Sequence, residues 1–216
     1  MERIFEIILP AIPQTLMMVS VSSVIAIALG LPLGLVLYVT QKKGLSENLF
    51  IYRILDAIIN MLRSLPFVVL MLVVFPLSLF IVGRRIGTEA AIVPLTVSAI
   101  PFVARLMETY LNEVDKGIIE AARAMGSGTF TIVTKVLIRE ALPQIINGIT
   151  MTIINLIGLS AIAGIIGGGG LGDVANRYGY QRNQVDILWA ACIVIIFLVQ
   201  AVQFIGNRLS KSINKK

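Results

Sequence analysis

The chain has 216 residues, of which 57% are apolar and only 14% are charged, with a mean hydropathy of +0.91. Soluble domains carry about 25% charged residues, so this composition indicates an integral membrane protein and excludes an ordinary water-soluble enzyme. The net charge of +6 is better explained by Lys and Arg flanking membrane spans than by a nucleic-acid partner.

Five apolar runs predict an all-α membrane protein with five transmembrane helices in a single domain over residues 1–216. A helix needs roughly 20 residues to cross the hydrocarbon core. The first run is longer than the apolar part of a signal peptide and follows an acidic N-terminus, so we expect it to be retained. The runs cover about residues 15–39, 66–82, 90–104, 143–166 and 187–203.

The distribution of cationic residues predicts the orientation of these helices. Thirteen Lys and Arg residues follow the first, third and fifth runs, whereas five lie on the opposite side. Because cytoplasmic loops are enriched in Lys and Arg, the N-terminus is expected outside and the C-terminus in the cytoplasm. The segment of about residues 115–140 is then cytoplasmic.

Residues 52–65 form an amphipathic stretch before the second run. Arg53, Asp56, Asn60 and Arg63 fall on one helical face, opposite Ile and Leu side chains. This pattern predicts a helix at the cytoplasmic interface, with its polar stripe in water or against protein. A stripe that contacts substrate is the alternative.

Charged residues are absent from all five runs. Intramembrane ionisable groups usually mark proton relays or ion sites, so their absence argues against a proton-coupled carrier and against a membrane hydrolase. The run Gly167–Gly172 lacks the Lys-Ser/Thr of a phosphate-binding loop and is expected to be an external loop. We therefore expect no catalytic residue, metal or cofactor in this chain, and an energy source on another polypeptide.

The fourth run contains small and polar positions. Gly148, Thr152 and Asn155 share one helical face, which favours either close helix packing or the lining of a pathway at a two-fold interface. Five helices are few for enclosing a solute pathway, so a homodimer is predicted. The candidate pathway residues are Asn155, Ser160 and Ile162.

The segment between the third and fourth runs predicts two short cytoplasmic helices. Asp115 is a suitable N-cap for the first helix, and Gly126 stands where a glycine ends a helix. A second helix is expected over residues 129–140. The apolar face of the first helix is formed by Ile118, Ala122 and Met125.

The run Glu120-Ala121-Ala122, with Gly126 four residues later, resembles the signature of permease subunits of binding-protein-dependent ABC importers. The resemblance implies that this segment forms a coupling helix that docks into a cleft of a separate ATPase subunit. Glu120, Ala121, Ala122 and Gly126 would carry that contact, and ATP and magnesium would lie on the partner. Arg139 departs from the proline that this signature normally has at that position.

Longer matches are similar to the methionine importers within this family: Arg63–Phe67, Ala90–Val97, Pro101–Arg105, Gly169–Gly172 and Tyr178–Tyr180. This similarity implies a homodimeric, multi-pass permease of the bacterial inner membrane that works by alternating access. Two ATP-binding cassette subunits and an extracytoplasmic methionine-binding lipoprotein would be its partners. The implied substrate is L-methionine, with the D-isomer left open. An importer of another amino acid or small metabolite, and a non-transporting membrane scaffold subunit, are the alternatives.

Overall fold

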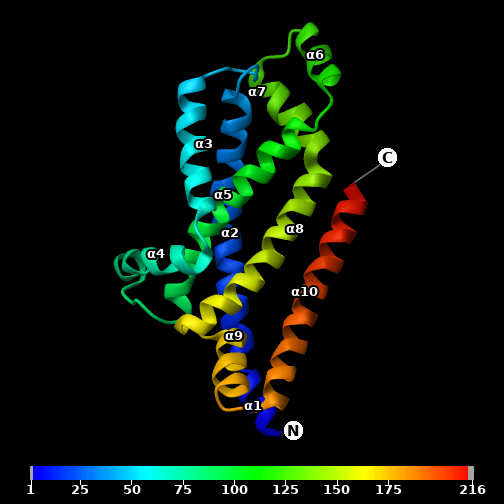
Figure 1. Cartoon of the computed structure of the whole chain (residues 1–216). Helices are drawn as coiled ribbons and strands as arrows, with labels where there is room; N and C mark the ends of the chain where they lie inside the picture. Colours follow the sequence, from blue (N-terminus) through cyan, green and yellow to red (C-terminus); the bar gives the residue numbers. More distant parts are fainter. Residues whose placement is uncertain (1, 214–216) are drawn as a thin grey trace.

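The computed structural model describes residues 2–213, and all regular elements within that range are helical. Four helices run roughly along the long axis of the molecule: α2 (Ala11–Thr40), α5 (Thr88–Asn112), α8 (Ile138–Ala163) and α10 (Val185–Ile213) (Figure 1). Four helical segments within residues 2–213 are long and apolar enough to cross a membrane, and a bent pair can supply a fifth crossing. The predicted all-α membrane fold is confirmed, whereas the orientation of the termini stays a prediction.

The central helix pair is α2 and α5. Gly30 and Gly34 lie four residues apart on α2, and both face α5 at close range. A Cβ atom added at Gly30 would lie 2.6 Å from Cβ of Val103, and one at Gly34 would overlap the Ala104 carbonyl. Small residues at this spacing allow close helix approach in membranes. The short helix α1 (Glu2–Ile8) precedes α2.

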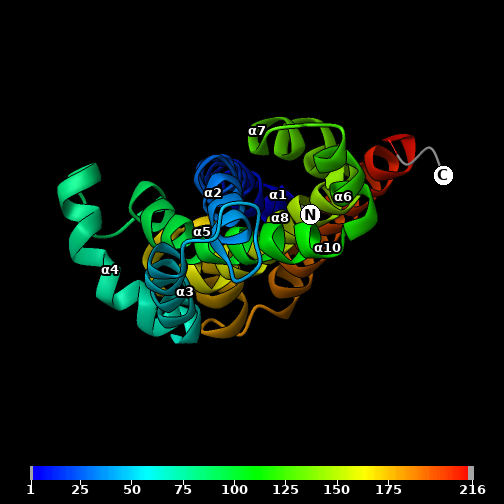
Figure 2. The same cartoon turned by 90° about the horizontal axis from the view of Figure 1, so that it is seen from above.

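The second crossing is bent rather than straight. The chain bends by 110° between helices α3 (Leu49–Ser64) and α4 (Phe67–Val82). Helix α4 projects sideways from the other helices (Figures 1 and 2). Pro66 explains the break, because proline disfavours a helical conformation at the preceding residue. Leu65 is accordingly extended, with φ −78° and ψ 128°.

Helix α3 is the helix that the amphipathic stretch predicts, with part of its polar stripe bonded to α5, whereas its position at the cytoplasmic interface stays a prediction. It lies against α2 and α5, where Ile59 packs with Leu37 and Ala104. Its outer face exposes Ile54, Ile58 and Met61, an apolar surface suited to lipid. Together with α4, helix α3 is long and apolar enough to form one crossing.

The predicted separate helix over residues 129–140 is instead continuous with the long helix α8. A turn of helix, α7 (Thr129–Thr131), continues through the π-helical segment η1 (Ile132–Leu137) into α8 without a break. Arg139, at the position of the family proline, keeps the backbone N–H that a proline would lack. Within this segment, α6 (Lys116–Ala124) is the separate short helix.

At the opposite end of the molecule, the chain reverses direction through residues 164–184. The π-helical segment η2 (Gly164–Gly168), α9 (Gly170–Val174) and the π-helical segment η3 (Ala175–Tyr180) lead from α8 to α10. The glycine-rich run is a tight turn bonded to α2. The Gln14 Oε1 accepts a hydrogen bond from the Gly170 N–H at 2.7 Å, and the Thr15 Oγ1 accepts one from the Leu171 N–H at 2.9 Å.

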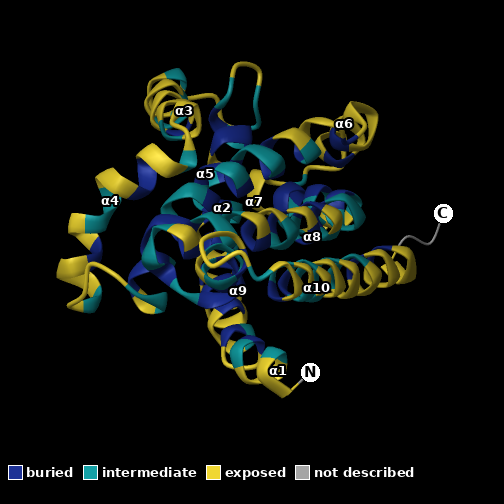
Figure 3. Cartoon of the chain, turned by 60° about the horizontal axis from the view of Figure 1, so that its bottom comes forward, coloured by how far each residue is buried: buried dark blue, intermediate teal, exposed yellow. Residues whose placement is uncertain are grey.

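Much of the outer surface is apolar. Exposed residues cover the outer sides of α4 and α10 (Figure 3), and they include Phe80, Trp189, Phe197 and Phe204. Large apolar patches of this kind mark surfaces that contact lipid or another protein.

Candidate functional site at the α6 end

Both ends of α6 are held by local hydrogen bonds. The Asp115 carboxylate accepts from the Gly117 N–H at 2.8 Å, as the sequence predicts for an N-cap. At the other end Gly126 has φ +79°, and the Ser127 N–H bonds back to the Ala122 carbonyl at 3.1 Å. This is the glycine-dependent helix end expected from the sequence, so residues within and beside α6 determine its length.

Helix α6 has one face toward the chain and one free face. Ile119 and Ala122 are buried in an apolar cluster with residues of η1 and the end of α5. Ile118 and Met125 are 40% and 78% exposed. The expected apolar face of Ile118, Ala122 and Met125 is therefore wrong as a single surface, because Ala122 points inward and the other two residues are exposed.

Three of the four predicted coupling residues are accessible. Glu120, Ala121 and Gly126 are exposed, whereas Ala122 is only 4% exposed. The small Ala122 side chain packs against the chain's own core and lets α6 lie close to it. A cavity of about 360 Å³ lies between α6 and the loop after α2, and its charged lining residues are Glu120, Arg123, Lys42, Lys43 and Lys116.

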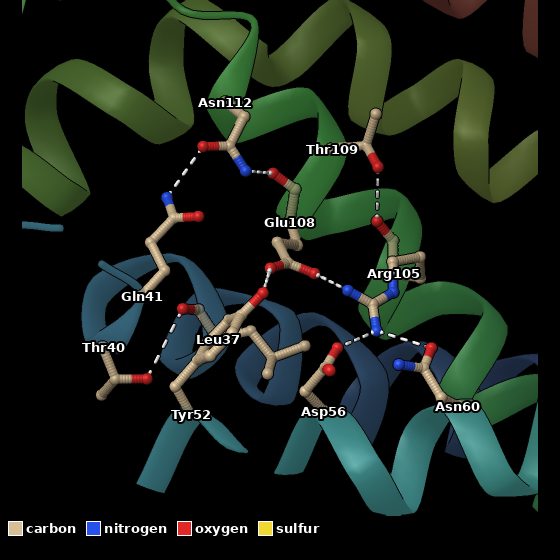
Figure 4. Close-up of polar contacts among 10 residues, drawn as sticks. All are labelled: Leu37, Thr40, Gln41, Tyr52, Asp56, Asn60, Arg105, Glu108, Thr109 and Asn112. Atoms are coloured by element: carbon tan, nitrogen blue, oxygen red, sulfur yellow. Dashed lines mark hydrogen bonds and ion pairs between the residues drawn. The ribbon is translucent and has the colours of Figure 1, made fainter. Parts of the chain in front are cut away.

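A network of charged and polar side chains joins α3 to α5 near this end (Figure 4). The Arg105 guanidinium donates to Asp56 and to Glu108, each at 2.5 Å, and to Asn60 at 3.0 Å. The Tyr52 hydroxyl donates to the other carboxylate oxygen of Glu108 at 3.2 Å. Two members of the polar stripe of α3 therefore bind one cation of α5.

The same network extends toward α6. The Asn112 side chain donates to the Glu108 carbonyl at 2.9 Å and accepts from the Gln41 amide at 2.8 Å. Glu108 is only 4% exposed, so its charge requires a close counter-charge, which Arg105 supplies. Sequence reasoning treated Arg105 as a flanking charge and missed this pairing. Asp56 could have indicated the pairing, because the sequence places this carboxylate on a helical face that could lie against protein.

The three pathway candidates do not share one surface. Asn155 is exposed and lines a cavity of about 260 Å³ beside the bend between α3 and α4. Ser160 is 2% exposed, and its hydroxyl donates to the Ile157 carbonyl at 2.7 Å within the same helix. Ile162 is half-buried and is not among the residues that line the cavity.

The helical face that includes Gly148 and Thr152 serves for packing. Both residues are buried, and a Cβ atom added at Gly148 would lie 2.6 Å from the Tyr110 ring. The Thr152 hydroxyl donates to the Gly148 carbonyl at 2.8 Å. These two residues hold α8 against α5, which separates their role from that of Asn155.

Residues 30–215 match the family described as binding-protein-dependent transport system inner membrane component. The chain belongs to this family. The resemblance carried by the Glu120-Ala121-Ala122 run is thereby confirmed, and the chain is a multi-pass component of the inner membrane.

Relatives within this permease family carry consistent names. The chain is 49% identical to the probable D-methionine transport system permease protein MetI of Vibrio cholerae, over 98% of this chain and 94% of that protein. It is 44% identical to the methionine import system permease protein MetP of Bacillus subtilis, over 83% of this chain and 81% of that protein. The D-methionine transport system permease protein MetI of Escherichia coli is 41% identical over 94% of each chain.

Solved structures of related transporters share the fold. An inward-facing structure of the MetNI methionine ABC transporter matches with a TM-score of 0.96 and 40% identity over 100% of both chains. An amino acid ABC transporter with histidines matches with a TM-score of 0.74 at 20% identity, over 98% of this chain and 94% of the other. At 20% identity, the second match shows only that the two chains share a fold.

Proposed function

We propose that this chain is the permease subunit of an ATP-driven importer that carries methionine across the bacterial inner membrane by alternating access. The observation that carries the proposal is the match over the whole length of both chains to a methionine transporter, at a TM-score of 0.96 and 40% identity. Relatives named for methionine or D-methionine transport support the same substrate.

In this proposal, a separate ATPase subunit drives transport by docking on α6. Ile118, Ala121 and Met125 are exposed on this helix, and an apolar helix face of this kind can dock into a groove on a partner. Glu120 offers a carboxylate beside this face, and Gly126 sets the chain reversal that ends the helix. The partner would be a separate ATPase subunit that holds ATP and magnesium, and this chain would itself be non-catalytic.

The proposed assembly contains two copies of this chain and two ATPase subunits, served by an extracytoplasmic methionine-binding lipoprotein. A closed two-fold dimer would cover part of the exposed apolar surface and bring Asn155 of each copy toward a shared pathway. In this assembly the α6 end faces the cytoplasm, the N-terminus lies outside and the C-terminus lies inside, as the distribution of Lys and Arg favours.

Purification of the complex tests this proposal. The full-length chain, tagged and extracted from its native membrane in mild detergent, is expected to bring an ATPase subunit with it at about one copy per copy of this chain. The complex, reconstituted in vesicles with its binding protein, is expected to take up labelled L-methionine when ATP is supplied.

The outcomes separate the alternatives. If another unlabelled amino acid competed for uptake better than methionine, the substrate would be reassigned. Recovery of the ATPase without uptake of any solute would favour a scaffold subunit. Recovery of the chain without an ATPase, under conditions that preserve a known importer, would overturn the coupling role of α6.

A further inference from the structure

The cavity at the bend between α3 and α4 combines one cation with neutral polar groups and an apolar wall. Its volume is about 260 Å³. Arg63 reaches it from the last turn of α3, Ser98 from α5 and Asn155 from α8, while Phe67 and Phe102 supply aromatic surface. Four helices thus contribute to one small site.

The cavity lies beside the middle of the long helix α5. Ser98 and Phe102 stand on either side of Ile100, the middle residue of the 25-residue helix α5. The bend between α3 and α4 lies part-way along the length of α2 and α5 (Figure 1). Arg63 is exposed and lines the cavity from the end of α3 that adjoins the bend.

Arg63 and Arg105 differ in their ionic partners. Arg105 is paired with Asp56 and Glu108. Arg63 lines the cavity, and the structure shows no ion pair to it from residues 2–213. In membrane proteins, ionisable residues that face a cavity within the helix bundle often mark a substrate or ion pathway. The free guanidinium at the cavity therefore indicates an anionic ligand.

We propose that Arg63 binds the α-carboxylate of the transported amino acid in this cavity, with the oxygen atoms of Ser98 and Asn155 accepting from its ammonium group. The inference rests on the proposed importer function and names a substrate contact within it. Guanidinium and carboxylate groups form paired, charge-assisted hydrogen bonds. The Phe67 and Phe102 rings suit an apolar side chain, and a thioether sulfur makes favourable contacts with aromatic rings.

The test measures methionine molecules transported per ATP hydrolysed, in vesicles that contain the complete permease–ATPase complex with saturating methionine-loaded binding protein. Saturation removes the contribution of the binding protein's own affinity. Arg63→Gln is expected to lower this ratio about tenfold or more, because a hydrogen-bonded charge pair is lost. Arg63→Lys, which keeps a cation without the planar fork, is expected to give an intermediate ratio.

Arg53→Gln is the matched control. Arg53 is an exposed arginine on the same helix, ten residues earlier, and does not line the cavity, so its loss is expected to leave the ratio unchanged. A general loss of assembly would lower transport and ATP hydrolysis together, whereas loss of a substrate contact lowers their ratio.

Asn155→Leu keeps the test decisive if Arg63→Gln fails to assemble. Asn155 is exposed on α8, and its replacement by an apolar residue of similar size is also expected to lower the ratio. Wild-type ratios in Arg63→Gln, or in both Arg63→Lys and Asn155→Leu, would overturn the carboxylate site alone. Failure of the wild-type complex to transport methionine would instead overturn the proposed function, and this inference with it.

Discussion

The two ends of the molecule are held together by different kinds of interaction. At the α6 end, α3 is tied to α5 by side chains, with Arg105 between Asp56 and Glu108. At the α9 end, the contacts involve backbone atoms. A Cβ atom added at Gly172 would overlap the Ala161 carbonyl, and the Gly170 N–H is bonded to Gln14.

This difference has a mechanical consequence. Long side chains in an ion-pair network can exchange partners while the helices that carry them move apart. Backbones in direct contact cannot slide without losing packing, because close-packed interiors resist continuous deformation. We expect relative motion of helices to be concentrated at the α6 end, where the proposed ATPase would act.

The largest expected effect on stability comes from breaking the network. Arg105→Leu leaves Glu108 as a buried carboxylate without its cation, and removal of one partner of a buried pair costs about 3 kcal/mol or more. Thermal unfolding of the purified protein in detergent, followed by circular dichroism, is expected to show a clear drop in midpoint temperature.

Arg177→Leu is the matched change at the α9 end. Arg177 pairs with Asp173 one helical turn away, but its side chain is 52% exposed, and exposed pairs of this spacing contribute only about 0.3–0.5 kcal/mol. The expected shift in midpoint is therefore small. Equal shifts for Arg105→Leu and Arg177→Leu would contradict the view that the α6 end depends on its ion pairs.

An effect smaller than that of Arg105→Leu but larger than that of Arg177→Leu is expected from overfilling the α9 end. Gly172→Ala places a methyl group against the Ala161 backbone, which cannot rotate away as a side chain would. Overpacking of this kind costs about 1–3 kcal/mol, measurable as a lower urea or heat midpoint. Gly158→Ala is the control, because a Cβ atom there meets open space and alanine favours a helix by up to about 1 kcal/mol. A stable Gly172→Ala protein would show that this end is looser than its backbone contacts indicate.

Features set by local sequence could be predicted. The presence of long apolar helices follows from continuous apolar runs. The limits of α6 follow from Asp115 and Gly126, whose hydrogen bonds reach only a few residues along the chain. The proline at residue 66 was visible too, but a proline marks a break without giving the angle between the two helices.

Features set by packing between distant segments could not be predicted. Arg105 and Asp56 are 49 residues apart in sequence, and no local pattern distinguishes a cation that pairs within the protein from one that flanks a span. Hydropathy likewise assigned the second crossing to α4 alone and did not show that α3 packs along α5. Gly30 and Gly34 are a signal of close helix packing, but their spacing does not identify α5 as the partner.

Substitutions at Gly126, the residue that ends α6, are expected to cost little stability. Gly126 has φ +79° and open space around its Cβ position, so conformation and not volume restricts the residue. Asp and Asn are the side chains that adopt this conformation most readily after glycine. Gly126→Asp and Gly126→Asn should therefore unfold at similar temperatures, each within about 1 kcal/mol of the unchanged protein.

The two Gly126 variants are expected to differ in coupling. A carboxylate at the C-terminal end of a helix meets the negative end of the helix dipole, and a partner docked on α6 would have to bury that charge without compensation. Methionine uptake and ATPase co-purification should fall sharply in Gly126→Asp and be largely kept in Gly126→Asn. Normal uptake by Gly126→Asp would mean that the partner does not cover this end of α6. Equal loss of uptake in both variants would mean that coupling requires glycine at this position, whatever the charge of the side chain that replaces it.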